Sequence, residues 1–215
     1  MKLYGYYRSS TSYRTRIVLN LKGLDYDCAP VALDRGEQHQ ETYRSVNPMG
    51  AVPALETGDG VFIQSPAIIE YLEECFPEPA LLPPDPVGRA RVREIAALIA
   101  CDIHPVNNLR VMRYIGEHYG QDREGIGRWY AHWIHAGFRP LEALLAERSS
   151  GGRYCIGDTA TLADAYLIPQ VYNARRFSVP LDDYPVIRGI DAYCTGLPAF
   201  RAAHPDRQPD APSPE

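Results

Sequence analysis

The pattern of hydrophobic and polar positions changes from mixed to purely helical partway along the chain. An apolar run at 2–7 is followed by apolar residues at helical spacing from Thr15 to Gly23, and then by alternating apolar and polar residues at 26–33. Alternation is typical of a strand, whereas apolar positions three and four residues apart are typical of an amphipathic helix. This stretch therefore predicts a strand, a helix and a second strand.

Two more strands and a helix follow in the same pattern. After a short polar helix at 41–45, strand patterns at 52–56 and 61–64 are separated by Thr-Gly-Asp-Gly, which is turn chemistry for a hairpin. A helix is predicted at 66–75, with Ser65 as its N-cap and a proline in its first position. This order of elements predicts an α/β thioredoxin-like domain.

A cluster of prolines divides the chain. Five prolines fall between Pro77 and Pro86, a density that neither a helix nor a central strand tolerates. We therefore predict a first domain at 1–76, a linker at 77–86, a second domain at 87–205, and a flexible tail at 206–215.

The second domain is predicted to be all helical. Helical periodicity runs through 87–118, 123–147, 161–174 and 185–195, and strand signals nearly vanish. Within it, Thr161-Leu-Ala-Asp164 fits the hydroxyl-x-x-acid start of a helix, which we interpret as structural.

Composition and charge exclude several classes of function. The 22 Lys and Arg against 27 Asp and Glu give a net charge of -5, which argues against a nucleic-acid partner. No uncharged apolar stretch is long enough to span a membrane, and the N-terminus lacks the pattern of a signal peptide. Five scattered cysteines fit reduced thiols. We therefore expect a cytoplasmic protein with neither nucleic-acid nor membrane partners.

Two histidines in the second domain are spaced like metal ligands. His132 and His135 lie three residues apart on a predicted helix, but no acidic or cysteine partner is in register with them. We predict no metal site there.

Four hydroxyl residues in a row stand where the first strand passes into the first helix. The run Ser9-Ser10-Thr11-Ser12 follows Arg8 directly. A helix N-terminus carries free backbone N–H groups, and hydroxyls beside them form an anion site. Simple N-capping is the alternative for any one of these residues.

This run is one of several short motifs that point to a known family. The others lie on both sides of the proline cluster, and the motifs are R-S-S-x-S-x-R at 8–14, Asn47-Pro48, Val52-Pro53, Gln64-Ser65, the helix at 68–72, Asp102-Ile103-His104-Pro105 with Asn107-Asn108, Gly157-Asp158 with 161–164, Arg176-Phe177 and Tyr184-Pro185. Over nearly its whole length the sequence resembles the zeta-class glutathione transferases, which include maleylacetoacetate isomerase and maleylpyruvate isomerase. One residue departs from the family pattern, because the third position of the first motif is commonly Cys and is Thr11 here.

The resemblance implies a glutathione transferase architecture with glutathione as the cofactor. Ser9 would donate a hydrogen bond to the glutathione sulfur, and the helix N-terminus would favour the negative charge of the thiolate. Lowering a thiol pKa of about 8.5 by about two units, or roughly 2.7 kcal/mol, makes the thiolate the dominant form at neutral pH. Ser9 is therefore the expected catalytic residue.

The same resemblance implies further contacts to glutathione. Val52 is expected to precede a cis proline and to pair with the tripeptide as an edge strand would; a plain turn proline is the alternative. Gln64 and Ser65 would bind the γ-glutamyl carboxylate, and Gln38 the glycyl end. The remaining expected cofactor contacts are Ser10, Thr11, Asp102, His104 and Asn108.

The isomerase chemistry of the family also calls for cations. Its maleyl substrates are dianionic and conjugated; the thiolate adds to the cis double bond, the resulting single bond rotates, and elimination gives the trans product. Arginine suits the carboxylates and the developing enolate because its guanidinium is planar and permanently charged. The candidate substrate-binding residues are Arg8, Arg110 and Arg176.

The expected function is therefore glutathione-dependent isomerisation of maleylacetoacetate to fumarylacetoacetate, in the catabolism of tyrosine and phenylalanine. Three alternatives stay open: the same reaction on maleylpyruvate, a transferase that conjugates or dehalogenates small electrophiles, and a non-catalytic glutathione-binding module. The resemblance also implies a homodimer, in which Asp102 and His104 would line the site from either subunit.

Overall fold

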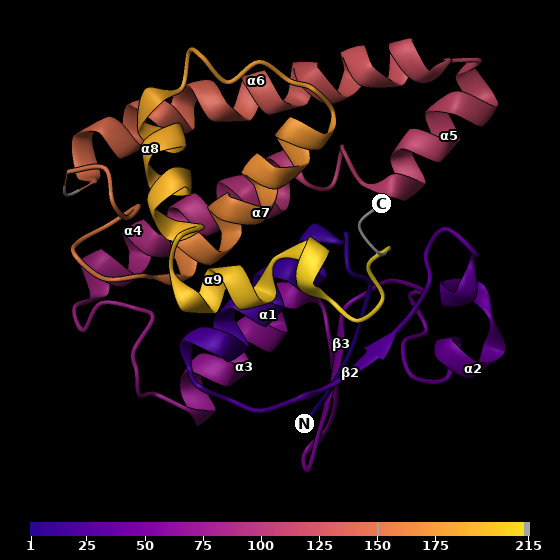
Figure 1. The fold of residues 1–215 in the computed structure, drawn as a ribbon, viewed down its shortest axis with the longest axis horizontal. Coiled ribbons are helices and arrows are strands. Elements are labelled where there is room, and N and C mark those ends of the chain that lie inside the picture. Colours follow the sequence, from indigo (N-terminus) through magenta and orange to yellow (C-terminus); the bar gives the residue numbers. More distant parts are fainter. Residues whose placement is uncertain (150, 213–215) are drawn as a thin grey trace. The chain divides into compact units, whose positions relative to one another are not determined.

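The computed structural model describes residues 1–149 and 151–212, which divide into two units (Figure 1). One unit contains Met1–Leu81 together with 195–212, and the other contains Leu82–Cys194. No helix among the described residues is long and apolar enough to cross a membrane.

The first unit is built on a four-stranded mixed sheet in the order β2-β1-β3-β4. Its strands are β1 (Lys2–Gly5), β2 (Asp27–Pro30), β3 (Ala54–Thr57) and β4 (Gly60–Ile63). β1 runs parallel to β2, with Leu3 opposite Cys28, and antiparallel to β3, with Leu3 opposite Leu55. This topology confirms the predicted thioredoxin-like domain.

Two longer helices contribute buried apolar side chains to the core of this unit. They are α1 (Ser10–Leu21) and α3 (Ser65–Cys75); a 3-10 turn (Glu37–His39) and α2 (Glu41–Arg44) connect β2 to β3. The side chains of Ile17, Val18, Leu55, Ile68 and Leu72 are completely shielded from solvent. Burial of these apolar residues is the main favourable contribution to the stability of the unit.

Both helices begin earlier than the apolar pattern predicts. α1 starts at Ser10 rather than Thr15, because the Ser9 side chain accepts a hydrogen bond from the Ser12 N–H and so caps the helix at that point. The predicted cap of α3 is also corrected: Gln64, not Ser65, is the N-cap, and its side chain makes no capping hydrogen bond.

The second unit is helical, as the sequence predicts. Its helices are α4 (Pro86–Ala97), a π-helix (Leu98–Ile103), α5 (Leu109–Tyr119), α6 (Arg123–Arg148), α7 (Leu162–Arg176) and α8 (Pro185–Cys194). The continuous helix expected at 87–118 is interrupted, because the Asn108 side chain accepts a hydrogen bond from the Arg110 N–H and starts a new helix. The capping box of Thr161 and Asp164 is confirmed at the start of α7.

The chain after α8 differs from the predicted domain division. Helix α9 (Pro198–Ala203) lies beside α1 (Figure 1) and belongs to the first unit, although the sequence predicts it within a domain at 87–205. Asn20 Nδ2 donates to the Ala199 carbonyl at 3.0 Å, and Arg16 Nε donates to the Ala203 carbonyl at 3.0 Å. Of the predicted flexible tail, 206–212 is described and hydrogen-bonded, while 213–215 lies outside the described residues.

A buried ion pair holds the start of the proline-rich segment. The Lys22 ammonium lies 2.7 Å from a Glu73 carboxylate oxygen, and the two side chains are 0% and 6% exposed. Lys22 also donates to the Phe76 and Pro79 carbonyls, while Glu73 accepts the Leu81 N–H. One pair of charges thus fixes this segment to α1 and α3.

Glu73→Ala should strongly destabilise the protein. The substitution leaves the buried Lys22 ammonium without its counter-charge, which costs about 3–5 kcal/mol. Urea unfolding followed by circular dichroism measures the loss. Glu74→Ala is the matched control, since Glu74 is exposed and should change stability by less than about 0.5 kcal/mol. Equal unfolding midpoints for the two variants would contradict the assigned role.

Candidate functional site

The N-terminus of α1 is the centre of the candidate site in the first unit. Ser9 is half-buried and has an extended backbone, and its Oγ accepts the Ser12 N–H at 3.2 Å. The first turn of α1 contains no acidic residue. Because the free N–H groups and the helix dipole favour negative charge, this end of the helix is suited to an anionic ligand.

A chain of hydroxyls connects Ser9 to the loop before β3. Thr11 Oγ1 donates to the Val52 carbonyl at 2.9 Å, and Ser9 Oγ lies 2.8 Å from Thr11 Oγ1. A threonine hydroxyl has a single proton, so with that proton on Val52 the Ser9 hydroxyl is the donor toward Thr11. Rotation of the Ser9 hydroxyl would turn the Ser9 proton away from Thr11 and toward a ligand. The structure thus brings together Ser9, Thr11 and Val52.

The loop that carries Val52 is braced by two residues that are not among the predicted site residues. The bond between Val52 and Pro53 is cis, as the resemblance implied. Asn47 Nδ2 and the Tyr43 hydroxyl both donate to the Ala51 carbonyl, at 2.6 Å and 2.7 Å. Burial raises the pKa of Tyr43 to about 12, so its hydroxyl remains a neutral donor. The Asn-Pro dipeptide was the one available sequence signal for this brace.

The N-terminus of α3 forms a second anion-favouring point in the same unit. Gln64 has a φ of 70°, a backbone conformation that is uncommon for a residue with a side chain. Ser65 is buried, and the first turn of α3 again contains no acidic residue. Local backbone strain of this kind costs about 1–3 kcal/mol and occurs preferentially at ligand sites.

Gln38 is buried with an unused hydrogen-bonding atom. Its side chain is 4% exposed, its Nε2 lies 3.1 Å from His39 Nε2, and its Oε1 has no partner among the described residues. Gly50 lies close to the Gln38 backbone. Its φ is 59°, and a Cβ at this position would lie 2.9 Å from the Gln38 carbonyl oxygen, so a residue with a side chain would not fit there. A buried amide with a spare atom can bind an incoming polar ligand.

The other two predicted residues of this region have different exposures. Ser10, the first residue of α1, is 5% exposed. Arg8 is half-buried, and its guanidinium carbon lies 5.9 Å and 5.6 Å from the ring centroids of Tyr6 and Tyr7. Stacking on these rings restrains Arg8 directly beside Ser9.

In the second unit, four predicted residues lie on the first turn of α5 or shortly before it in the chain. Asp102 is exposed on the π-helix, and His104 Nε2 lies 3.4 Å from Asn108 Nδ2. Asn108 is the N-cap of α5, and Arg110 is exposed in the first turn of the helix. The cap therefore connects His104 to the backbone of Arg110.

Arg176 lies at the C-terminal end of α7. It is the exposed last residue of α7, with its guanidinium carbon 4.9 Å from the Phe177 ring centroid. The Phe177 ring stacks on Tyr130, with the ring centroids 3.7 Å apart. Burial raises the pKa of Tyr130 to about 12, against the opposing effect of the Arg176 charge.

Three of the five cysteines are poor nucleophiles. Burial raises the pKa of Cys28, Cys155 and Cys194, which keeps these thiols protonated near neutral pH. Among the described residues, no group of three or more His, Cys, Asp or Glu side chains could hold a metal ion. His135 Nδ1 lies 2.7 Å from the Tyr184 hydroxyl, which gives this histidine a structural partner.

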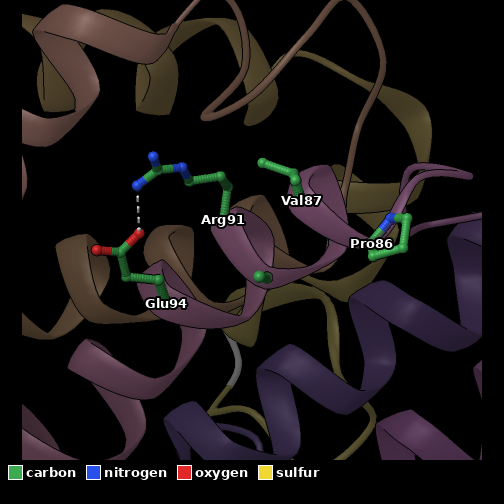
Figure 2. Close-up of a pocket in the computed structure, with 5 residues that line it drawn as sticks. Pro86, Val87, Arg91 and Glu94 are labelled. Atoms are coloured by element: carbon green, nitrogen blue, oxygen red, sulfur yellow. Dashed lines mark hydrogen bonds and ion pairs between the residues drawn. The ribbon is translucent and has the colours of Figure 1, made fainter.

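A hollow of about 470 Å³ lies on the outer face of α4 and contains none of the predicted site residues (Figure 2). Pro86, Val87, Ala90, Arg91 and Glu94 line it. Arg91 and Glu94 point toward one another at 3.4 Å, and Glu94 is also paired with Arg148. Because its charged groups are engaged with each other, the hollow lacks the convergent polar groups of a ligand site.

The comparisons with known proteins agree with this fold. Residues 3–80 match the family model described as glutathione S-transferase, N-terminal domain. Together with the helical second unit, this match defines the protein as a glutathione transferase by architecture.

Relatives that match nearly the whole chain identify the class of glutathione transferase. Maleylacetoacetate isomerase of Pseudomonas aeruginosa is 50% identical, over 99% of this chain and 100% of the relative. The holo structure of maleyl pyruvate isomerase, described as a bacterial zeta-class glutathione transferase, is 54% identical, with a TM-score of 0.97 over 99% of this chain and 100% of that one. Maleylacetoacetate isomerase of Methylobacterium extorquens AM1, with bound malonate and glutathione, is 40% identical, with a TM-score of 0.94 over the same shares. The chain belongs to the zeta-class glutathione transferase family, whose members include these isomerases.

Thr11→Val should weaken the site, whereas Thr11→Ser should preserve it. Valine has nearly the shape of threonine but cannot connect Ser9 to the Val52 carbonyl, and loss of such hydrogen bonds costs about 0.5–1.5 kcal/mol each. We expect the KM for glutathione to rise about three- to tenfold in Thr11→Val and to stay near the wild-type value in Thr11→Ser. An unchanged KM in Thr11→Val would show that the bridge has no part in binding.

Proposed function

We propose that this protein is the glutathione-dependent isomerase that converts maleylacetoacetate to fumarylacetoacetate. The observation that carries the proposal is Ser9, which caps an acid-free helix N-terminus and whose hydroxyl proton can turn toward a bound thiolate. The named isomerases among the relatives support the reaction class.

The residues of the first unit fit glutathione. The Val52 backbone would pair with the tripeptide, the backbone N–H groups at Gln64 and Ser65 would bind a carboxylate, and the Gln38 amide has an unused polar atom. When bound, glutathione supplies the thiolate that adds to the cis double bond and leaves again after rotation about the single bond.

The chain's own residues would stabilise the charges of the reaction. Ser9 donates a hydrogen bond to the sulfur anion, with the α1 dipole adding to its effect. We assign Arg8, beside Ser9, to one substrate carboxylate, and Arg110 and Arg176 to the second carboxylate and the enolate. We propose Asp102, His104 and Asn108 as further contacts from the second unit.

Maleylpyruvate is the second candidate substrate. The specific observation in its favour is the 54% identical relative, whose name is maleyl pyruvate isomerase. Both substrates contain the same maleyl unit, so both use the same thiolate and cationic groups.

Turnover of the two maleyl compounds by the purified protein tests the proposal. With glutathione present, kcat/KM should be higher for maleylacetoacetate than for maleylpyruvate, measured from the loss of absorbance of each cis compound. The opposite preference would assign the protein to maleylpyruvate. Retention on immobilised glutathione without turnover of either compound would instead identify a binding module.

An arginine variant in the same assay separates isomerisation from conjugation. Loss of a charge-assisted contact costs about 1.5–3 kcal/mol, so Arg176→Ala should lower isomerisation about 10- to 100-fold and conjugation of a halogenated electrophile far less. Arg128→Ala is the matched control, because Arg128 is 65% exposed and pairs only with Glu124 among the described residues. Equal losses of both activities in Arg176→Ala would count against the assigned role.

Three further features complete the proposal. The reaction places the enzyme in tyrosine and phenylalanine catabolism, and the scattered cysteines support a cytoplasmic location. We also propose a homodimer, as the resemblance to the zeta class implies; light scattering reports the oligomeric state.

A further inference from the structure

Residues near the C-terminal end of the described chain contact the turn that precedes Ser9. Within the first unit, the Asp210 carboxylate accepts the Tyr7 N–H at 2.9 Å. Tyr7 stands two residues before Ser9, and the Ser9 N–H donates to the Tyr6 carbonyl at 3.0 Å. A residue more than two hundred positions away in sequence thus holds the backbone of the candidate catalytic turn.

The other side of the same turn is held by a buried arginine. Arg16 is 3% exposed and donates through Nη2 to the Tyr7 carbonyl at 2.9 Å. Its Nε donates to the Ala203 carbonyl at 3.0 Å, so one guanidinium connects the turn to the end of α9. Tyr7 is therefore fixed at its N–H by Asp210 and at its carbonyl by Arg16.

The segment that presents Asp210 is itself well held. Gln208 Nε2 donates to the Ala202 and His204 carbonyls, both at 2.9 Å, and its backbone carbonyl accepts the Ala211 N–H. A small cavity of about 20 Å³ lies between this segment and the turn, lined in part by Tyr7, Arg16 and Asp210. Only about one water fits such a volume, so the segment is packed closely on the turn.

Asp210 also matters for the buried charge. Burial lowers the pKa of Arg16 to about 10, and Asp210 is the carboxylate that opposes this shift. A buried guanidinium with a nearby carboxylate stays in its hydrogen-bonding geometry at lower cost than one without.

We propose that Asp210 is a positioning residue for the reaction: it holds the Tyr7 backbone so that Ser9 Oγ stays at the glutathione sulfur. This inference rests on the role proposed for Ser9. The C-terminal segment is then part of the active-site support and not a passive tail. Asp210 itself contacts neither cofactor nor substrate in this account.

Two substitutions separate the hydrogen bond from the charge. Asp210→Asn keeps an acceptor for the Tyr7 N–H and removes the charge, whereas Asp210→Ala removes both. Asp206→Asn is the matched control, because Asp206 lies on the same segment with its side chain 76% exposed. If Asp210→Ala does not fold, Asp210→Ser is measured in its place by the same criteria.

The first readout needs no cofactor. Amide hydrogen exchange of Tyr7 and Ser9 in the glutathione-free protein should become faster in Asp210→Ala and remain close to wild type in Asp210→Asn and Asp206→Asn. The second readout is the pKa of the bound glutathione thiol, titrated by ultraviolet absorbance. It should rise by about 0.5–1 in Asp210→Ala, with kcat at neutral pH falling about 1.5- to threefold as the thiolate fraction falls, and the KM of the maleyl substrate unchanged.

Three results would overturn the inference. A thiol pKa that is unchanged in Asp210→Ala, even with faster exchange, would leave Asp210 a purely structural residue. A thiol pKa that falls equally in Asp210→Ala and Asp210→Asn would indicate a through-space charge effect and not positioning. Equal effects in Asp206→Asn would show that the contact is not specific. Failure of the proposed function would look different, because the wild-type protein would then turn over neither maleyl compound while both readouts still reported on Asp210.

Discussion

The unsatisfied N–H groups at the start of α1 are the constraint on which the rest of the site depends. Ser9 satisfies one of these N–H groups, because its Oγ accepts a hydrogen bond from the Ser12 N–H. The Ser9 hydroxyl proton points to Thr11 and can rotate toward a ligand. The turn that places Ser9 is fixed by the Tyr6 carbonyl, by Arg16 and by Asp210. A cap that stabilises the helix therefore also presents a hydrogen-bond donor at the positive end of its dipole.

The magnitudes are compatible with formation of a thiolate. Lowering the pKa of the glutathione thiol by about two units requires about 2.7 kcal/mol of stabilisation of the thiolate. A hydrogen bond to a charged group contributes about 1.5–3 kcal/mol, and a helix N-terminus adds about 0.3–1 kcal/mol. The protein as a whole carries a net charge of -5, so its overall charge does not attract dianions. The favourable potential has to arise locally, from backbone N–H groups at α1 and α3 and from arginines such as Arg8.

The sequence predicts features that depend on local patterns. Alternation, helical spacing and turn residues give the order of strands and helices, and the hydroxyl run marks the start of α1. Features set by tertiary partners are not visible in this way. The positive φ of Gln64 occurs at a residue type that rarely adopts it. The proline-containing segment around Asp210 is held by the distant Tyr7 N–H, and the end of α9 before it by Arg16. The Asn47-Pro48 motif is visible in the sequence, but the role of Asn47 in bracing the loop is seen only in its contact to the Ala51 carbonyl.

Ser9 at the N-terminus of α1 is the residue that we expect to stabilise the glutathione thiolate. A pH titration of thiolate absorbance, for glutathione bound to the wild-type protein and to Ser9→Ala, measures this directly. We expect a thiol pKa of about 6.5 in the wild type, two units below that of a free thiol, and a rise of at least about one unit in Ser9→Ala. The same thiol pKa in both proteins would show that Ser9 does not stabilise the thiolate.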